Sequence, residues 1–178
     1  MEGHYSDLEE VLAFREHVYG LQRNFLKNME QGCLVSFGMN IPGPVKTNSQ
    51  IWKAYRLGRK KIEQRIRELG TEILADTSVE IRSGLATVYL LGVSDACVIK
   101  REMVKLEETY PLGRLFDIDV IGRDGLSVSR SQLGMVPRKC LLCDREAKLC
   151  ARSRRHCIED LQQAVCDLLD QEIEGEAK

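Results

Sequence analysis

Residues 113–125 read GRLFDIDVIGRDG, in which an apolar run at 115–121 contains two acids and is followed by Gly122. A short apolar run that ends at glycine predicts a buried strand. Upstream, residues 71–93 have the alternation of a β-hairpin, and residues 94–108 have helical spacing with Ser94 as the predicted cap. The resulting strand–helix–strand unit predicts a mixed β-sheet covered by helices, so the predicted fold class is α+β.

The rest of the 178-residue chain reads as helices around this sheet. Helical spacing predicts a first helix over residues 6–29, capped by Ser6, and a second helix over residues 49–69. The sheet core should extend over about residues 33–136, and a C-terminal helical segment over about residues 144–174, divided into two pieces. We expect a single domain, because a chain of this length builds one hydrophobic core.

Composition excludes several classes of protein. The chain has 26 Lys and Arg against 27 Asp and Glu, so it is not a uniformly basic nucleic-acid binder. Its first residues have acids where a signal peptide needs a basic region, and no stretch approaches the ~20 apolar residues of a membrane span. We therefore expect a cytoplasmic protein whose seven cysteines are mostly reduced thiols.

The two acids of the central strand are Asp117 and Asp119. Residues two apart on a strand project from the same face, so both carboxylates should point one way. Adjacent carboxylates repel each other, and Mg²⁺ commonly relieves this repulsion while it binds substrate phosphates. The pair, with Arg114 just before it, predicts phosphoryl or nucleotidyl transfer; the alternative is that these acids only bond to backbone groups or to an arginine.

A second cluster covers residues 138–157, RKCLLCDREAKLCARSRRHC. Cys140 and Cys143 have the C-x-x-C spacing of many zinc sites, and Cys150 with either His156 or Cys157 could complete four ligands. Buried cysteines, however, commonly act as small hydrophobic residues, and Cys150 and Cys157 fall on the apolar stripe of a predicted helix. We therefore expect core thiols here rather than structural zinc.

The same cluster and one loop supply candidate ligand-binding groups. Arg138, Arg152 and Arg155 belong to a dense run of arginines whose guanidinium groups suit phosphate oxygens. His156 could bind a phosphate or accept a proton from an attacking hydroxyl, or it could be an ordinary surface histidine. In the loop NIPGPVK, Asn40 and Lys46 could line a ligand site, although such loops are often simple connections.

The second predicted helix has a basic face. We interpret this face either as a solvated surface or as a contact for an anionic ligand or an acidic partner protein. Its Lys and Arg residues are Lys53, Arg56, Arg59, Lys60, Lys61, Arg65 and Arg67.

Taken in order along the chain, these motifs resemble the citrate lyase holo-acyl-carrier-protein synthase family, also called apo-citrate lyase phosphoribosyl-dephospho-CoA transferase. The matching stretches are MNIPGPVK at 39–46, PLGRLFDIDVI at 111–121, the Ser129-Arg130 step, and residues 138–156. The resemblance implies a nucleotidyltransferase that uses triphosphoribosyl-dephospho-CoA as donor. It implies transfer of the phosphoribosyl-dephospho-CoA group to a serine of the citrate lyase acyl carrier protein, with release of pyrophosphate.

The resemblance also implies roles for the candidate residues. Asp117 and Asp119 are expected to hold Mg²⁺ against the donor phosphates, and one of them, or His156, to receive the serine proton. The expected substrate-binding residues are Asn40, Lys46, Arg114, Ser129, Arg130, Arg138, Arg152 and Arg155.

Two alternatives and one departure stay open at this point. The chain could be a non-catalytic module that binds a carrier protein through a Cys-rich zinc or helical site, or the related malonate decarboxylase carrier synthase. A nucleotidyltransferase-like fold is one candidate for the α+β scaffold. Enzymes with the polymerase-β-like fold usually have a Gly-Ser step about a dozen residues before the Asp pair, whereas this sequence has only Gly92-Val93-Ser94, more than twenty residues upstream.

Overall fold

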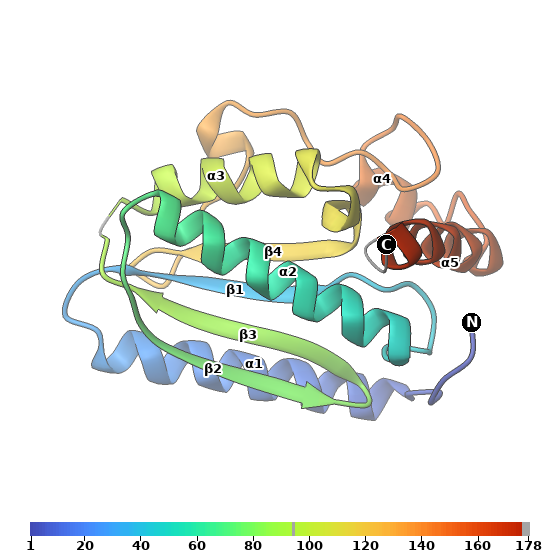
Figure 1. Cartoon of the computed structure of the whole chain (residues 1–178), viewed down its shortest axis with the longest axis horizontal. Helices are drawn as coiled ribbons and strands as arrows, with labels where there is room; N and C mark the ends of the chain where they lie inside the picture. Colours follow the sequence, from blue (N-terminus) through green and yellow to red (C-terminus); the bar gives the residue numbers. More distant parts are fainter. Residues whose placement is uncertain (94, 176–178) are drawn as a thin grey trace.

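A four-stranded sheet with helices on both faces forms the body of the protein (Figure 1). The computed structural model describes residues 1–93 and 95–175. The strands are β1 (Cys33–Met39), β2 (Ile73–Ile81), β3 (Gly84–Leu91) and β4 (Phe116–Ile121). The helices are α1 (Leu8–Asn28), α2 (Ser49–Glu68), α3 (Ala96–Thr109), α4 (Ala147–Arg152) and α5 (Ile158–Gly175), with short 3₁₀ turns η1 (Pro111–Leu115) and η2 (Ser131–Leu133).

The predicted α+β class is confirmed, but the strand pairing differs from that of a mixed sheet. The sheet order is β2-β3-β1-β4, and each neighbouring pair is antiparallel. The predicted strand–helix–strand unit is β3–α3–β4. Because β1 inserts between β3 and β4, these two strands run parallel to each other without being hydrogen-bonded, so the parallel ladder of a mixed sheet does not form.

One face of the sheet packs on α2 and α3 and forms the larger core. Phe37 of β1 stacks on Tyr55 of α2 and meets Phe116 of β4 edge-on, with ring centroids 5.4 and 5.1 Å apart respectively. Gly58 lets α2 approach this closely, because a Cβ there would lie 2.6 Å from the Phe37 ring and 2.8 Å from the Phe116 ring. The aromatic contacts therefore fix the position of α2 on the sheet.

The opposite face packs on α1. Leu34, Val88 and Ile121 of the strands meet apolar side chains of α1 that include Leu21 and Phe25. This second core is small, and no residue of α1 itself is fully buried. The two aspartates lie beside a cavity that α1 lines in part.

The helix boundaries follow local capping chemistry. Asp7 caps α1, not Ser6 as predicted: its carboxylate accepts from the Glu10 amide at 2.8 Å, and the Glu10 side chain accepts from the Asp7 amide in return. The predicted cap Ser94 lies outside the described residues, and Asp95 accepts from the first amides of α3. The C-terminal segment is divided as predicted, into α4 and α5, with Ser153 at the end of α4.

Side chains cover the outer edge of β4, which would otherwise present free backbone groups. The Ile118 amide donates to Glu107 at 3.2 Å, and Lys100 donates to the Ile118 carbonyl. The Val128 amide and Arg138 reach the carbonyls of Val120 and Phe116. This edge is therefore held rigidly, which fixes the strand that carries the aspartates.

None of the helices in the described part of the chain is long and apolar enough to cross a membrane.

Candidate active site

Asp117 and Asp119 project from the α1 face of β4, as their spacing predicted, while Phe116, Ile118 and Val120 are buried on the other face. Both aspartates line a cavity of about 290 Å³ between α1, the sheet and the loop that follows β1. The carboxylates therefore face this cavity and not the hydrophobic core. A ligand in this cavity would meet both of them.

The neighbouring strand leaves room above the carboxylates. Asp117 is paired with Gly38 and Asp119 with Ser36 in the β1–β4 ladder. The Ser36 hydroxyl accepts a hydrogen bond from Gln22 Nε2 at 2.8 Å, so α1 contributes directly to the polar wall. A glycine opposite Asp117 and a small hydroxyl opposite Asp119 keep the floor of the cavity open.

Positive groups line the same cavity. Lys46 closes the loop after β1 by donating from Nζ to the Ile41 carbonyl at 2.8 Å. Burial lowers the pKa of Lys46, and the nearby positive charge of Arg15 lowers it further. Asn40 also lines the cavity. Two of the predicted substrate-binding residues, Asn40 and Lys46, thus lie beside the aspartates.

The electrostatics of the pair suit a cation. Burial, and then the charge of Asp117, raise the pKa of Asp119 above its ordinary value. Neither carboxylate has a hydrogen bond or an ion pair to any side chain in the described part of the chain. Two unpaired oxygen donors on one face, opposite a position where a Cβ would fill space, fit the ligand preference of Mg²⁺.

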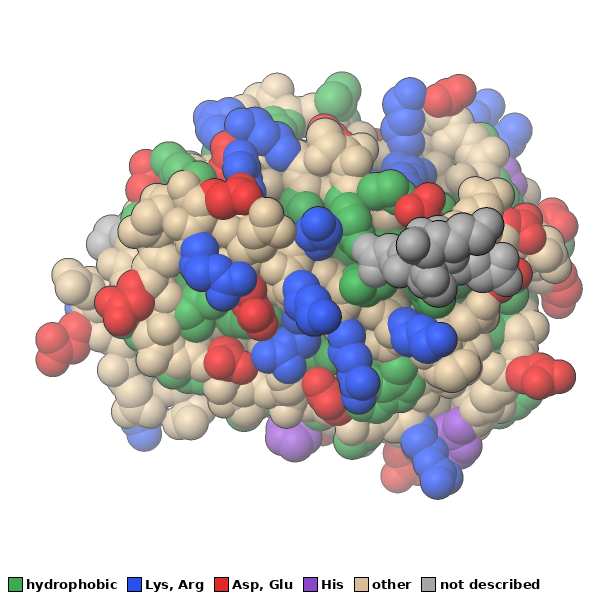
Figure 2. All heavy atoms as spheres, viewed as in Figure 1, with side chains coloured by type: hydrophobic (Ala, Val, Ile, Leu, Met, Phe, Trp, Pro, Cys, Tyr) green, Lys and Arg blue, Asp and Glu red, His purple; other side chains and the backbone are tan. Residues whose placement is uncertain are grey.

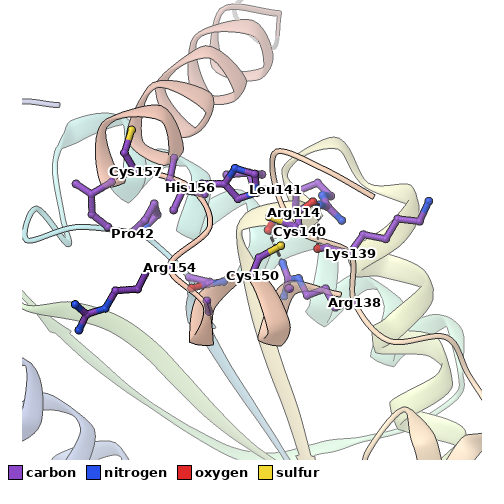
Figure 3. A pocket seen from close by; sticks show the side chains of 15 residues that line it. Pro42, Arg114, Arg138, Lys139, Cys140, Leu141, Cys150, Arg154, His156 and Cys157 are labelled. Carbon is purple, nitrogen blue, oxygen red and sulfur yellow. Dashed lines mark hydrogen bonds between the residues drawn. The ribbon is translucent and has the colours of Figure 1, made fainter. Parts of the chain in front are cut away.

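A second and larger cavity, of about 640 Å³, lies between the loop after β1 and the segment around α4 (Figure 3). Its walls combine apolar side chains with Arg114, Arg138 and Arg154. Asn40 lines this cavity as well as the one that holds the aspartates. The two cavities are therefore adjacent along one loop.

His156 lies in the second cavity, where it belongs to a cluster of cysteines, and the structure does not bring it to the aspartates. Its Nε2 lies 3.4 Å from the Cys143 sulfur, which lies 3.6 Å from the Cys150 sulfur. With Cys140, the four ligand atoms all lie within 4.8 Å of one another. The predicted role of His156 as proton acceptor is thus at odds with its position, because its ring nitrogen faces a thiol.

The surroundings shift the pKa values of Cys143 and Cys150 in opposite directions. A hydrogen bond from the Arg145 backbone, and then one from His156, lower the pKa of Cys143 to about 6. Burial and the neighbouring thiols raise the pKa of Cys150 to about 11. Because the two pKa values shift in opposite directions, the Cys143 thiolate forms readily and its charge disfavours ionisation of Cys150. Cys157, the other candidate ligand, instead accepts from the Asp160 amide through its sulfur.

Two of the predicted phosphate-binding arginines that line the larger cavity donate hydrogen bonds to the backbone of the protein. Arg114 donates to the carbonyls of Lys139 and Cys140, at 3.2 and 2.6 Å. Arg138 donates to the Phe116 and Arg114 carbonyls. Both still line the larger cavity, but these bonds show that they hold the chain in place.

Arg130 lies elsewhere, on the α3 side of the sheet. It forms ion pairs with Glu107 at 2.6 Å and Glu108 at 2.5 Å, and Glu107 in turn holds the outer edge of β4. Arg130 therefore supports β4 through Glu107.

The remaining candidates lie outside both cavities. Ser129 bonds to Ser131 and Gln132 in an exposed turn. Arg152 and Arg155 are exposed and line neither cavity. Arg152 and Arg155 are close to His156 in the sequence, but they do not line the cavity of the aspartates.

Sequence reasoning missed three residues that line the cavity of the aspartates, and α1 supplies two of them. Arg15 and Gln22 lie seven residues apart on one helix face, and that polar spacing within an amphipathic helix was the available signal. Ser36 is marked only by its polarity within an apolar strand. Arg154, which belongs to the dense run of arginines seen in the sequence, lines the larger cavity and has a positive φ of 46°.

The basic face of α2 lies across the sheet from the aspartates (Figure 1). Figure 2 shows its Lys and Arg side chains interleaved with Asp and Glu. Arg59 and Arg65 are ion-paired with acids of the sheet and of α3, while Lys61 and Arg56 lie over aromatic rings. Much of this face is therefore satisfied within the protein.

Comparisons with known proteins agree on one family. The family model for apo-citrate lyase phosphoribosyl-dephospho-CoA transferase matches residues 6–172. A relative from Streptococcus pyogenes serotype M18 (strain MGAS8232) is 34% identical over 94% of this chain and 87% of its own length. One from Vibrio cholerae serotype O1 (strain M66-2) is 35% identical over 89% and 90%. Both are described as probable apo-citrate lyase phosphoribosyl-dephospho-CoA transferases. The chain belongs to the apo-citrate lyase phosphoribosyl-dephospho-CoA transferase family.

Proposed function

We propose that this chain, a transferase by its family, attaches phosphoribosyl-dephospho-CoA to a serine of the citrate lyase acyl carrier protein, with triphosphoribosyl-dephospho-CoA as donor. The observation that carries this proposal is the unpaired Asp117–Asp119 pair in a cavity with positively charged walls. Such a site suits a triphosphate, whose charge needs both a metal ion and cationic side chains.

The reaction would be a displacement at phosphorus. The serine oxygen forms a bond to the phosphorus next to the ribose, the bond from that phosphorus to the pyrophosphate oxygen breaks, and the serine proton passes to a base. Asp117 and Asp119 would hold Mg²⁺, which, when bound, neutralises phosphate charge and aligns the hydroxyl with the departing pyrophosphate.

The chain's own residues would divide the remaining work. Lys46 and Arg15 face the cavity and can share the negative charge of the leaving pyrophosphate. One of the two carboxylates would receive the serine proton. His156 is left out of this chemistry, because its ring nitrogen faces Cys143.

The donor is long, and the two adjacent cavities offer a place for each end. We place the triphosphate beside Asp117 and Asp119, and the dephospho-CoA portion past Asn40 into the larger cavity. The apolar lining there, which includes Leu141 and Leu161, suits an adenine ring or the pantetheine arm, and Arg154 suits the diphosphate.

The experiment combines the purified protein with apo-carrier subunit, donor and Mg²⁺, and weighs the carrier by intact mass spectrometry. The carrier should gain the mass of the prosthetic group. Asp119→Asn should lose at least about 10²-fold in rate, as removal of a group at the reacting centre commonly does. Asp124→Asn is the matched control, because Asp124 accepts only from the Leu126 amide outside this cavity, and it should stay active.

A fully active Asp119→Asn enzyme would refute the site assignment. No mass gain on the citrate lyase carrier, with a gain on the malonate decarboxylase carrier tested in parallel, would redirect the assignment to that acceptor. No gain on either carrier, from a folded protein, would favour a non-catalytic carrier-binding role.

A further inference from the structure

We propose that Cys140, Cys143, Cys150 and His156 bind a structural Zn²⁺ ion. This differs from the expectation of core thiols that the sequence supported, and it does not depend on the proposed function. The four potential ligand atoms, three sulfurs and one ring nitrogen, all lie within 4.8 Å of one another.

Two of the six separations between ligand atoms match the dimensions of a zinc site. Tetrahedral zinc, with Zn–S bonds of about 2.3 Å and Zn–N bonds of about 2.05 Å, places two sulfurs about 3.8 Å apart and a sulfur and a nitrogen about 3.5 Å apart. The sulfurs of Cys143 and Cys150 are 3.6 Å apart, and His156 Nε2 is 3.4 Å from the Cys143 sulfur. These distances are far longer than the ~2.05 Å of a disulfide.

The backbone brings the first two ligands together in a tight turn. Residues 139 and 146 form an isolated antiparallel bridge, and the Cys140 amide donates to the Arg145 carbonyl at 2.7 Å. Arg114 holds the Lys139 and Cys140 carbonyls from the other side. The C-x-x-C pair thus lies at the tip of a braced loop, which is the usual setting for such a pair in zinc sites.

The end of α4 brings in the other two ligands. Cys150 projects from this helix, and the Arg155 amide then donates to the Cys150 carbonyl at 3.1 Å while the Arg154 amide donates to Ala151. These bonds, with Arg154 at φ 46°, form a Schellman motif that reverses the chain. The reversal places His156 next to Cys143 although the two are 13 residues apart.

The segment has little hydrophobic core of its own. The six-residue α4 is too short to be stable alone, and between residues 137 and 157 only Cys140 and Cys150 are buried. A closed set of four ligands leaves no open position for catalysis. We therefore assign the ion a structural role: it ties residues 138–157 together and shapes the wall of the larger cavity, which Cys140, Cys150 and His156 line.

The test is the metal content of the untagged full chain expressed in zinc-replete cells, measured by plasma mass spectrometry. About one zinc per chain is expected for the unmodified protein. Cys143→Ser should lose most of it. Cys157→Ser is the matched control and should keep it, because the exposed Cys157 sulfur accepts from the Asp160 amide outside the cluster.

A second measurement covers the case in which Cys143→Ser does not fold. A mercurial reagent added to the unmodified protein should release zinc to a colorimetric chelator as its thiols react. Cobalt exchanged into the site should show the intense visible bands of tetrahedral Co²⁺ and thiolate-to-cobalt charge transfer. Protein that carries no zinc and gives no such cobalt spectrum, or full zinc retention in Cys143→Ser, would overturn the assignment. A Cys143–Cys150 disulfide in the purified protein would do the same.

Discussion

Asp117 lies directly opposite Gly38 in the antiparallel ladder between β4 and β1, so one carboxylate of the pair stands next to a position without a side chain. Gly38 has no positive φ, and a Cβ built there meets only the Leu85 carbonyl oxygen, at 3.5 Å. The backbone therefore does not require glycine. The cavity beside Asp117 does, because any larger side chain would occupy it.

This relationship predicts the behaviour of Gly38→Val. A β-branched residue fits a strand, so the melting temperature should change little. The rate of transfer should fall by about 10²-fold or more, since the substituent displaces the phosphate from the carboxylates. Gly20→Ala, in an open position on α1, is the control for substitution of glycine and should retain activity. Full activity in Gly38→Val would show that the donor does not use the space beside Asp117.

Asp119→Asn should stabilise the fold at neutral pH while it abolishes transfer. Because the pKa of Asp119 is raised in the folded state, its stabilising contribution is present below its unfolded pKa and is lost as pH rises through the folded value. Ionised Asp119 thus costs stability at neutral pH, and asparagine removes this cost. Unfolding in metal-free buffer should show a gap between the two proteins that widens from about pH 4 to pH 7. A variant less stable than the parent at pH 7 would contradict the raised pKa of this carboxylate beside Asp117.

Arg154→Gly should separate stability from donor binding. Arg154 has the left-handed conformation at the end of α4, where glycine is the favoured residue, so the substitution should stabilise the protein by about 0.5–1 kcal/mol. The same change removes a guanidinium from the larger cavity and should raise KM for the donor about 10-fold, with a smaller change in kcat. Arg152→Gly, two residues earlier in the chain and outside the cavity, should leave KM unchanged. An unchanged KM in Arg154→Gly would show that the dephospho-CoA portion does not bind in this cavity.

Charge reversal tests which face receives the carrier protein. Lys53 and Lys60 are exposed on α2, across the sheet from the aspartates, so Lys53→Glu and Lys60→Glu should change KM for the carrier by no more than about twofold. Arg15 lines the catalytic cavity from α1, and Arg15→Glu should reduce kcat/KM by about 10-fold or more. Steady-state kinetics with varied carrier distinguishes the two. A large effect of Lys53→Glu or Lys60→Glu would show that the carrier protein docks on α2.

Local patterns in the sequence were sufficient for the elements and for the acid pair. Helical spacing located α1 and α2 to within about two residues, because a buried stripe must recur every turn. The projection of Asp117 and Asp119 from one face follows from strand geometry alone. The family motifs, read in order, led to the same transferase family that the comparisons show.

Tertiary packing decided which of the charged residues belong to the site. Arg130 and Arg138 follow the acids in the sequence, yet they support the edge of β4, because an edge strand needs partners for its outward backbone groups. Arg15 and Gln22 enter the site from a helix distant in the sequence, through the packing of α1 on the sheet. His156 joins the cysteines instead of the aspartates because a Schellman reversal after α4 sets its direction. The sequence alone could determine which groups share a strand or a helix face, since that depends on local backbone geometry, whereas only the tertiary structure could decide which faces meet.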